Sequence, residues 1–374
     1  MRTVLVAADS FKGGLDQQSV CHALAEGIRR GCHSRVDLDL CPLADGGEGT
    51  GLVVSSWGGA VEWLIAEDAY GRPRRAQWIR YHRTALVEAS QGSPYVPPGD
   101  RPFGARRTTS RGTGQLLRHA LEDPGIEDVW LALGGSGSVD GGLGLLVELG
   151  ARFFDRKGGV LEPSLEILDA IWRAEFPTLS KPVTVLADVM VPLSGPTGAL
   201  RQFGPQKGLP LSQALTLDGQ LGEFSERVAP GAGGMPGAGA AGGMGFALGA
   251  LGARIVSGAD WLAARSRLDE RAARADLVVT GEGRLDPQSL MGKVISVVLK
   301  SARKAGKPVV VIAGQIPEDM RQYYDSGVSL ALALPRGPMT LEESIHHTEA
   351  LVRASGEQIG RMLDLCDALS NGGQ

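Results

Sequence analysis

The sequence has little of what marks nucleic-acid-binding proteins and P-loop enzymes. Lys and Arg number 38 against 42 Asp and Glu among 374 residues, which gives a net charge of −4. A domain that binds nucleic acid usually carries a strong basic excess, so this balance argues against that class. The GxxxxGK[ST] pattern of phosphate-binding P-loops is also absent from the sequence.

Cysteine and histidine are scarce and poorly spaced for metal or disulfide chemistry. The four cysteines, Cys21, Cys32, Cys41 and Cys366, form no CxxC pair, and the six histidines include no HExxH motif. These spacings suggest neither a zinc site nor a dense disulfide frame. We expect reduced thiols and a cytoplasmic location, because the apolar run before Asp9 is too short for a signal peptide.

Long hydrophobic runs are missing as well. The longest stretch without charge, residues 228–253, contains ten glycines and few large apolar side chains. A membrane-spanning helix needs about 20 mostly apolar residues, so we predict no membrane segment here. Glycine is abundant instead, with 54 residues of 374, roughly twice the usual share. Much of the chain should therefore form tight turns and close backbone approaches, which often line ligand sites.

Strand-like and helix-like patterns alternate along the chain, which predicts an α/β fold with a largely parallel sheet. Short apolar runs typical of strands occur at 3–8, 36–40, 129–133, 183–187, 277–280, 309–313 and 330–334, and helical patterns occur at 211–228, 290–305 and 341–365. Closely spaced runs at 61–65, 76–81 and 85–88 favour antiparallel or mixed pairing.

Two α/β domains would account for this change in the spacing of the strand-like runs. We predict that residues 1–75 and 276–374 form a discontinuous domain with a mainly parallel sheet and helices on both faces. A second, smaller domain with a mixed sheet and glycine-rich loops, residues 76–275, is predicted to be inserted into the first.

Acidic and basic residues follow the ends of several predicted strands. In a parallel sheet such loops meet at the carboxyl edge, where ligands bind. The acids are Asp9, Asp45, Glu48, Asp188, Glu282 and Asp286, and the cations are Lys12, Lys207, Arg284 and Lys293. Phosphoryl transfer needs this mixture, since cations neutralise phosphate oxygens while carboxylates hold Mg²⁺ and position the attacking hydroxyl. No histidine lies in these loops, which weakens a Ser-His-Asp hydrolase as an interpretation.

Two glycine-rich segments are candidate phosphate loops. Residues 134–142 (GGSGSVDGG) follow a predicted strand directly and precede a predicted helix, an arrangement that can cradle an anion. Within it, Asp140 is either a ligand-binding acid or the cap of that helix. Residues 237–242 fit GxGxxG, but no clear strand precedes them. They form either a phosphate loop or a small-residue helix packed on another backbone, and a Rossmann oxidoreductase is disfavoured.

Seven motifs in this order resemble those of the type I glycerate kinase family. They are DSFKG (9–13), LADGGEGT (43–50), TSRGTG (109–114), GGSGSVDGG (134–142), FGPQKG (203–208), PGAGAAGGMG (236–245) and TGEGRLDPQSLMGK (280–293). The resemblance covers essentially the whole chain. It implies ATP-dependent phosphorylation of D-glycerate with Mg²⁺ to give 2-phosphoglycerate. It also implies two α/β domains with the active site in the cleft between them.

The resemblance also implies roles for individual residues. The expected catalytic residues are Lys12, Asp45, Asp188, Lys207, Glu282 and Arg284. The expected ATP-binding residues are Gly134, Gly135, Ser136, Gly237, Gly239, Gly242 and Lys293. D-glycerate is expected to contact Asp9, Ser10, Lys12, Gly46, Gly47, Asp286 and Gln288. Asp45, Glu48 and Asp188 are the expected Mg²⁺ ligands. No nucleic acid or membrane partner is expected, and a homodimer is an open alternative to a monomer.

Two valines depart from the family pattern. Val139 and Val191 each stand where the family carries an amide side chain. A polar group left without its partner costs about 1–3 kcal/mol, so the two changes point to an altered site. Two alternatives therefore stay open: a kinase that acts on another small hydroxy acid, and a non-catalytic protein that binds nucleotide or glycerate.

Overall fold

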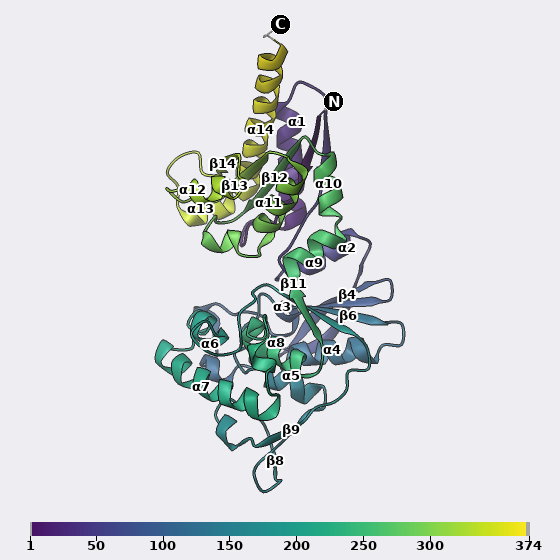
Figure 1. Cartoon of the computed structure of the whole chain (residues 1–374), viewed down its shortest axis with the longest axis vertical. Helices are drawn as coiled ribbons and strands as arrows, with labels where there is room; N and C mark the ends of the chain where they lie inside the picture. The colour runs from purple at the N-terminus through teal and green to yellow at the C-terminus, as the bar shows by residue number, and fades with distance from the viewer. Residues whose placement is uncertain (1, 372–374) are drawn as a thin grey trace. The chain divides into compact units, whose positions relative to one another are not determined.

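The computed structural model describes residues 2–371 and divides into two compact units (Figure 1). The first unit comprises Met1–Asp45 and Ala259–Gln374, and the second, Gly46–Gly258, is inserted between those segments. The predicted boundary at 75/76 differs from this division because residues 60–67 pair with residues 73–81 in the second unit's sheet. The boundary at 275/276 differs because Ala259, Leu268 and Ala272 pack in an apolar cluster of the first unit. The second unit spans more residues than the first, so the expectation that it is the smaller one is wrong.

The elements of each unit follow in chain order. The first unit contains β1 (Arg2–Val6), α1 (Gln17–Gly31), β2 (Val36–Leu40), α9 (Gly258–Arg265, which starts at the boundary), α10 (Leu268–Arg274), β12 (Leu277–Glu282), η5 (Pro287–Leu290), α11 (Val294–Ala305), β13 (Val309–Ala313), α12 (Arg321–Asp325), β14 (Leu330–Ala333), α13 (Leu341–His346) and α14 (Thr348–Asn371). The second contains α2 (Thr50–Ser56), β3 (Ala60–Glu67), β4 (Pro73–Tyr81), β5 (Thr84–Glu88), α3 (Ala89–Gly92), α4 (Arg111–Glu122), β6 (Asp128–Ala132), α5 (Leu143–Glu148), β7 (Arg152–Phe154), β8 (Val160–Leu161), β9 (Arg173–Glu175), β10 (Val183–Ala187), α6 (Ala199–Phe203), α7 (Leu211–Val228), α8 (Ala240–Ala250) and β11 (Arg254–Ser257).

The first unit is built on a five-stranded parallel sheet in the order β14-β13-β12-β1-β2. Side chains alternate between its faces, so Val4 and Val6 enter one apolar cluster and Leu5 enters the other. Helices α1 and α14 cover the first face, and α10 and α11 cover the second. The prediction of a parallel sheet with helices on both faces is therefore confirmed.

Helices α1 and α14 lie side by side (Figure 1) and approach each other at backbone distance. A Cβ atom on Gly27 would lie 2.0 Å from the carbonyl oxygen of Arg353, and one on Gly31 would lie 2.1 Å from that of Glu357. From the other side, a Cβ atom on Gly356 would lie 2.5 Å from the carbonyl oxygen of Leu24. Only glycine leaves room for these helices at this separation.

Several predicted element boundaries shift. The pattern at 341–365 forms two helices, α13 and α14, instead of one, because α13 ends at His346 and the backbone of His347 is not helical. The helix expected from 290 begins at Val294, after the short 3-10 helix η5. The predicted strands 36–40, 183–187 and 309–313 and the helix 211–228 are confirmed.

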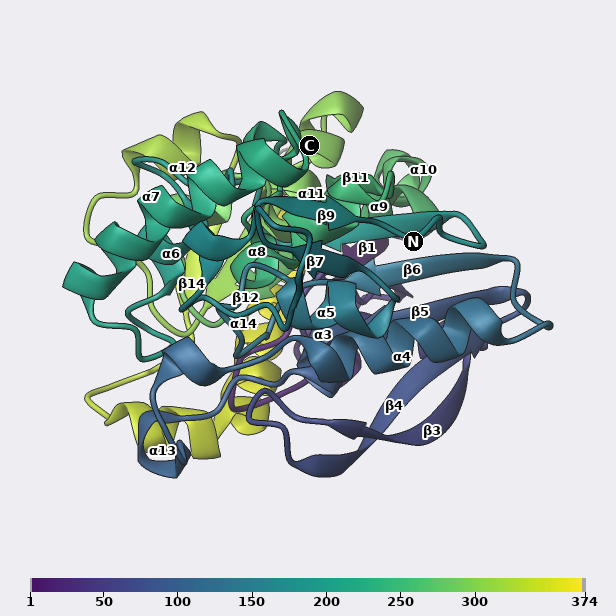
Figure 2. The same ribbon diagram turned by 90° about the horizontal axis from the view of Figure 1, so that it is seen from below.

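The second unit contains a six-stranded sheet in the order β11-β10-β6-β5-β4-β3 and a separate three-stranded sheet. Strands β5, β6, β10 and β11 are parallel, whereas β3, β4 and β5 pair antiparallel. Figure 2 shows α4 running along this sheet, where Leu116 and Leu117 join the unit's apolar core. The mixed pairing predicted for residues 61–88 is confirmed.

The uncharged stretch 228–253 lies inside the second unit. It supplies η4 (Ala232–Gly234) and α8, and residues 237–248 are buried. Within residues 2–371, no helix combines the length and the apolarity needed to cross a membrane.

The close approach of α1 and α14 predicts that Gly27→Ala destabilises the protein. The added methyl group overlaps the Arg353 carbonyl, and relief of such overpacking typically costs about 1–3 kcal/mol. Chemical unfolding monitored by circular dichroism measures this loss. Gly219→Ala in α7 is the matched control, because no atom lies within 4 Å of its Cβ position and alanine favours the helix by roughly 0.5–1 kcal/mol. Equal stabilities of the two variants would contradict the close-packing argument.

Candidate functional site

Three carboxylates meet at the carboxyl edge of the first unit's sheet. Asp9 follows β1, Asp45 follows β2, and Glu282 is the last residue of β12. These strands are neighbours in the sheet, so the ends of three parallel strands bring the acids together. The backbone N–H of Asp9 donates to the carbonyl oxygen of Gly281 at 3.2 Å, which ties the two loops.

Burial and mutual repulsion raise the pKa values of two of these acids. Burial, followed by the nearby charge of Asp45, raises the pKa of Asp9 to about 7, although Ser10 N–H and Lys12 oppose the shift. Burial also raises the pKa of Glu282 to about 7 against the opposing effects of Ser289 and Lys293. Its buried Oε1 atom has no hydrogen-bond partner among the described residues. The site therefore holds two carboxyl groups that change charge near neutral pH.

A cavity of about 530 Å³ opens onto these acids. Its polar lining consists largely of predicted site residues, namely Asp9, Ser10, Lys12, Asp45, Glu282, Arg284, Asp286 and Lys293. The loops after β13 and β14 and the helix α13 complete its wall. The first unit thus gathers the predicted residues of its own segments into one cavity, with Gln288 as the exception.

The loop after β12 is fixed by its own capping box. Asp286 accepts the backbone N–H of Gln288 at 2.8 Å, and Ser289 Oγ accepts the N–H of Asp286 at 2.9 Å. These bonds begin the 3-10 helix η5. Asp286 therefore has a structural role in addition to its place in the cavity wall, whereas Gln288 is exposed.

In the second unit, three parallel strands also end in polar loops. Glu88 ends β5, residues 134–136 follow β6, and Asp188 follows β10. A Cβ atom on Gly134 would lie 2.3 Å from Cα of Gly47 and 3.0 Å from the Asp188 carboxylate. Gly134 is needed at this position because the loop 46–47 crosses it at backbone distance.

Glu48 and Asp188 border this glycine turn, and Glu88 lies in the same unit. The Cβ position of Gly135, whose φ is +74°, lies 3.3 Å from Cβ of Glu48, and that of Gly134 lies 3.0 Å from the Asp188 carboxylate. Glu88 is buried and accepts the N–H groups of Gly49 and Gly51 at 3.0 and 3.1 Å. Burial, with a contribution from Glu48, raises the pKa of Glu88 to about 7.

Lys207 is a buried cation beside the same turn. It is 7% exposed, and its Nζ donates to Ser136 Oγ at 3.0 Å and to the carbonyl oxygen of Ser138 at 2.9 Å. Burial lowers its pKa to about 8, although Asp188 and Asp140 favour the charged form. An ammonium group has three donors, so these two bonds fix its position and use two of them.

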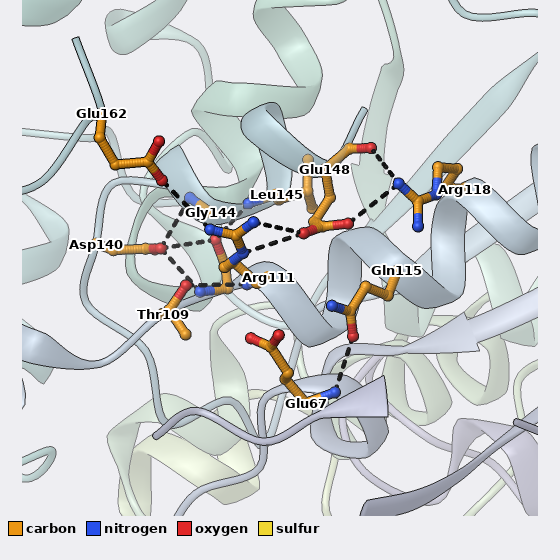
Figure 3. Close-up of polar contacts among 11 residues, drawn as sticks. Glu67, Thr109, Arg111, Gln115, Arg118, Asp140, Gly144, Leu145, Glu148 and Glu162 are labelled. Carbon is orange, nitrogen blue, oxygen red and sulfur yellow. Dashed lines mark hydrogen bonds and ion pairs between the residues drawn. The ribbon is translucent and has the colours of Figure 1, made fainter. Parts of the chain in front are cut away.

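The loop 134–142 differs from the expected cradle in one respect. Helix α5 has only six residues, and Asp140 accepts the N–H groups of Gly142 and Gly144 at its start. Asp140 also accepts from Ser110, so the cap interpretation of this acid is correct (Figure 3). Next to it, Arg111 bridges Glu148 and Glu162. The TSRGTG motif therefore anchors this loop, and the first N–H groups of α5 serve the protein itself.

The glycines of residues 237–242 pack against the chain's own backbone. A Cβ atom on Gly239 would lie 2.2 Å from the carbonyl oxygen of Pro192, and one on Gly242 would lie 2.3 Å from that of Ser138. A Cβ atom on Gly237 would lie 2.7 Å from the Ile255 side chain. These contacts agree with the alternative in which the segment packs on another backbone. The partners of Gly239 and Gly242 belong to the loops that follow β10 and β6.

The two valines lie in different surroundings. Val139 is 1% exposed and belongs to the apolar core, and its backbone N–H donates to Thr108 Oγ1 at 3.2 Å. Val191 is partly buried, and its carbonyl oxygen accepts the N–H of Gly239 at 3.0 Å. The Val139 side chain therefore contributes to packing.

The predicted Mg²⁺ ligands are divided between the units. Asp45 belongs to the first unit, and Glu48 and Asp188 belong to the second. Among residues 2–371, no group of three or more His, Cys, Asp or Glu side chains could hold a metal ion by itself.

Two features of the candidate site were missed in the sequence. Glu88 ends an apolar strand next to the other acids, and this position could have indicated it. The wall formed by α13 has no sequence signal, because Leu341 and Ile345 have the spacing of ordinary core residues.

A family model described as the glycerate kinase family matches residues 4–364. The chain belongs to this family. It is 35% identical to glycerate 2-kinase of Escherichia coli over 91% of this chain and 92% of that protein. It is 32% identical to glycerate kinase of Neisseria meningitidis over 97% of this chain and 99% of that protein. A crystal structure of a candidate glycerate kinase 2 from Salmonella typhimurium LT2 covers 98% of this chain and 99% of its own, with TM-score 0.80 and 32% identity.

Membership of the glycerate kinase family confirms the resemblance predicted from the motifs. The predictions of an α/β fold and of a phosphotransferase of the kinase class are confirmed with it.

The position of Lys207 predicts that Lys207→Ala lowers the rate of phosphoryl transfer about 10²–10³-fold, the usual cost of losing a charge-stabilising donor. Steady-state kinetics measure the loss. Lys181→Ala is the matched control, because Lys181 also donates to backbone carbonyl oxygens of this unit, those of Ala120 and Asp123. We expect both variants to lose about 1–3 kcal/mol of unfolding free energy and only Lys207→Ala to lose activity. Full activity in Lys207→Ala would contradict a role in the site.

Proposed function

We propose that the chain transfers the γ-phosphoryl group of ATP to the 2-hydroxyl of D-glycerate and releases ADP and 2-phosphoglycerate. The observation that carries the proposal is the cavity in the first unit, where three carboxylates face Lys12, Arg284 and Lys293. Transfer of a phosphoryl group requires cations around the phosphate oxygens and an acid that receives the hydroxyl proton. Glycerate kinase family membership supports the choice of acceptor.

The first unit has residues suited both to binding the triphosphate and to accepting the proton of the attacking hydroxyl. Lys12, Arg284 and Lys293 neutralise the triphosphate oxygens and the charge that develops during transfer. Glu282 and Asp9 are the candidates for accepting the proton of the attacking hydroxyl, because a general base works best when its pKa lies near the operating pH. Ser10 and Asp286 line the same cavity and are proposed to contact D-glycerate.

The second unit supplies a fixed positive charge. Lys207 has a position set by Ser136 and Ser138, and its third donor is proposed to bind an anionic oxygen of a substrate. We also propose that this substrate is approached by the backbone of four glycines, Gly46, Gly47, Gly134 and Gly135. We assign Gly237, Gly239 and Gly242 no direct contact with ATP, since their packing explains them.

Mg²⁺ fits the donor chemistry of these acids. Mg²⁺ in kinases is held by one or two carboxylates together with substrate phosphates and water, so a pair of acids is sufficient. We propose that Asp45 would hold it in the first unit, or alternatively that Glu48 and Asp188 would hold it in the second. When bound, the ion would neutralise negative charge on phosphate oxygens.

The main alternative is that another small hydroxy acid, instead of D-glycerate, accepts the phosphoryl group. Val191 lies in the same loop as Asp188, after β10, and departs from the family pattern. This departure favours testing other small hydroxy acids. A protein that binds ATP or glycerate without turnover is the remaining alternative. A cytoplasmic location and a homodimer stay predictions.

Purified protein incubated with ATP, Mg²⁺ and D-glycerate is expected to release ADP, with the phosphate on the 2-hydroxyl as determined by NMR of the product. A panel of hydroxy acids run in parallel tests the acceptor. Turnover with another acid and none with D-glycerate would overturn the acceptor, and binding without turnover of any acid would overturn catalysis.

Lys12→Ala is expected to lower kcat by about 10²–10³-fold, because Lys12 is proposed to act on the transferring group. Lys300→Ala, a solvent-exposed lysine of α11, controls for loss of a surface charge. Unchanged turnover in Lys12→Ala would contradict its assignment.

The dependence of kcat/KM on pH is expected to be bell-shaped. The rate rises through about pH 7 as Asp9 and Glu282 lose their protons, and it falls above about pH 8 as Lys207 loses its charge. Lys207→Arg should move the alkaline limb to higher pH, because arginine keeps its charge. An alkaline limb that stays near pH 8 in this variant would exclude Lys207 as its origin.

A further inference from the structure

One wall of the first unit's cavity is apolar, in contrast to its charged floor. Helix α13 turns Leu341, Ser344 and Ile345 toward the cavity, and Thr348 continues this row into α14. The spacing i, i+3, i+4, i+7 is that of a helix face which normally packs on a core. None of the residues of α13 is buried, so this face lines an open cavity instead.

The apolar side chains of this wall are exposed to an unusual extent. Leu341 is 77% exposed, and Ile345 and Met339 are each 36% exposed. Phe11 and Pro335 extend the apolar lining around them. Exposed apolar side chains that gather in a cavity mark a ligand-binding surface more often than singly scattered ones do.

The wall is held in place next to the cationic loop. Thr340 and Glu343 form a capping box that starts α13, with the Thr340 N–H donating to Glu343 at 2.7 Å. A Cβ atom on Gly14 would lie 2.3 Å from Thr348 Oγ1, and one on Gly13 would lie 3.7 Å from Ile345. The loop that carries Lys12 therefore packs directly against the row of residues on α13 and α14.

We propose that Met339, Leu341 and Ile345 bind the purine base of the nucleotide, while Lys12, Arg284 and Lys293 bind its phosphates. This inference rests on the proposed function and assigns the nucleotide to the first unit. A purine offers a large apolar face, whereas a three-carbon hydroxy acid is polar throughout and gains nothing from such a wall. The cavity's 530 Å³ lies within the range of about 300–1,000 Å³ that small-ligand sites occupy.

The experiment compares the double variant Leu341→Ala/Ile345→Ala with the unchanged protein. Isothermal titration calorimetry measures the affinities for ADP, for tripolyphosphate, which lacks the base, and for D-glycerate. We expect the ADP affinity to fall about tenfold or more, as loss of several buried methylene contacts implies, and the other two affinities to stay within about twofold. Leu365→Ala is the matched control, because Leu365 is also exposed, at 59%, but lies outside the cavity lining.

An unchanged ADP affinity in the double variant, or no ADP binding by the unchanged protein, would overturn the proposal. A raised KM for the hydroxy acid with unchanged ADP binding would overturn it in favour of an acceptor site. Failure of the proposed function has a different signature: the unchanged protein would release no ADP from ATP in the presence of D-glycerate, while the double variant would still lose ADP affinity. Thermal unfolding checks that the variants are folded.

Discussion

Burial of Asp9 and Glu282 beside the charge of Asp45 is the constraint around which the cavity of the first unit is arranged. Parallel strands deliver these acids to one edge, and burial removes the water that would screen them. The pKa values of about 7 for Asp9 and Glu282 record the cost of that arrangement. Lys12 and Lys293 offset part of it, and a ligand that brings positive charge would relieve more. A buried carboxylate group of this kind favours a ligand that carries positive charge.

In the second unit, the main structural feature is the close approach of backbone segments. Gly134 against Gly47 and Gly242 against Ser138 leave no space for side chains, so loops from distant parts of the sequence meet main chain to main chain. Lys207 then ties Ser136 to Ser138 within one of these loops. Part of the high glycine content of the sequence is thus explained by these close backbone contacts.

The sequence predicted most of the fold because its signals are local. Continuous apolar runs such as 309–313 specify buried strands, and three closely spaced strands specify a mixed sheet. The charged residues of the cavity were also predictable, because each acid lies at or after the end of a strand. The pairing of 60–67 with 73–81 in the second unit depends on tertiary contacts, so the predicted boundary at residue 75 differed from the division in the structure. The orientation of Leu341 toward a cavity instead of a core is equally invisible in the sequence, since both environments produce the same spacing.

The glycine contact between α1 and α14 has a consequence for ligand binding. Both helices start at the carboxyl edge of the sheet, α1 after the Lys12 loop and α14 after α13. Interlocked backbones cannot slide or rotate independently, so the charged floor and the apolar wall of the cavity are held at a fixed spacing. A nucleotide entering this cavity would meet a preorganised surface, and little of its binding free energy would be lost to ordering the protein.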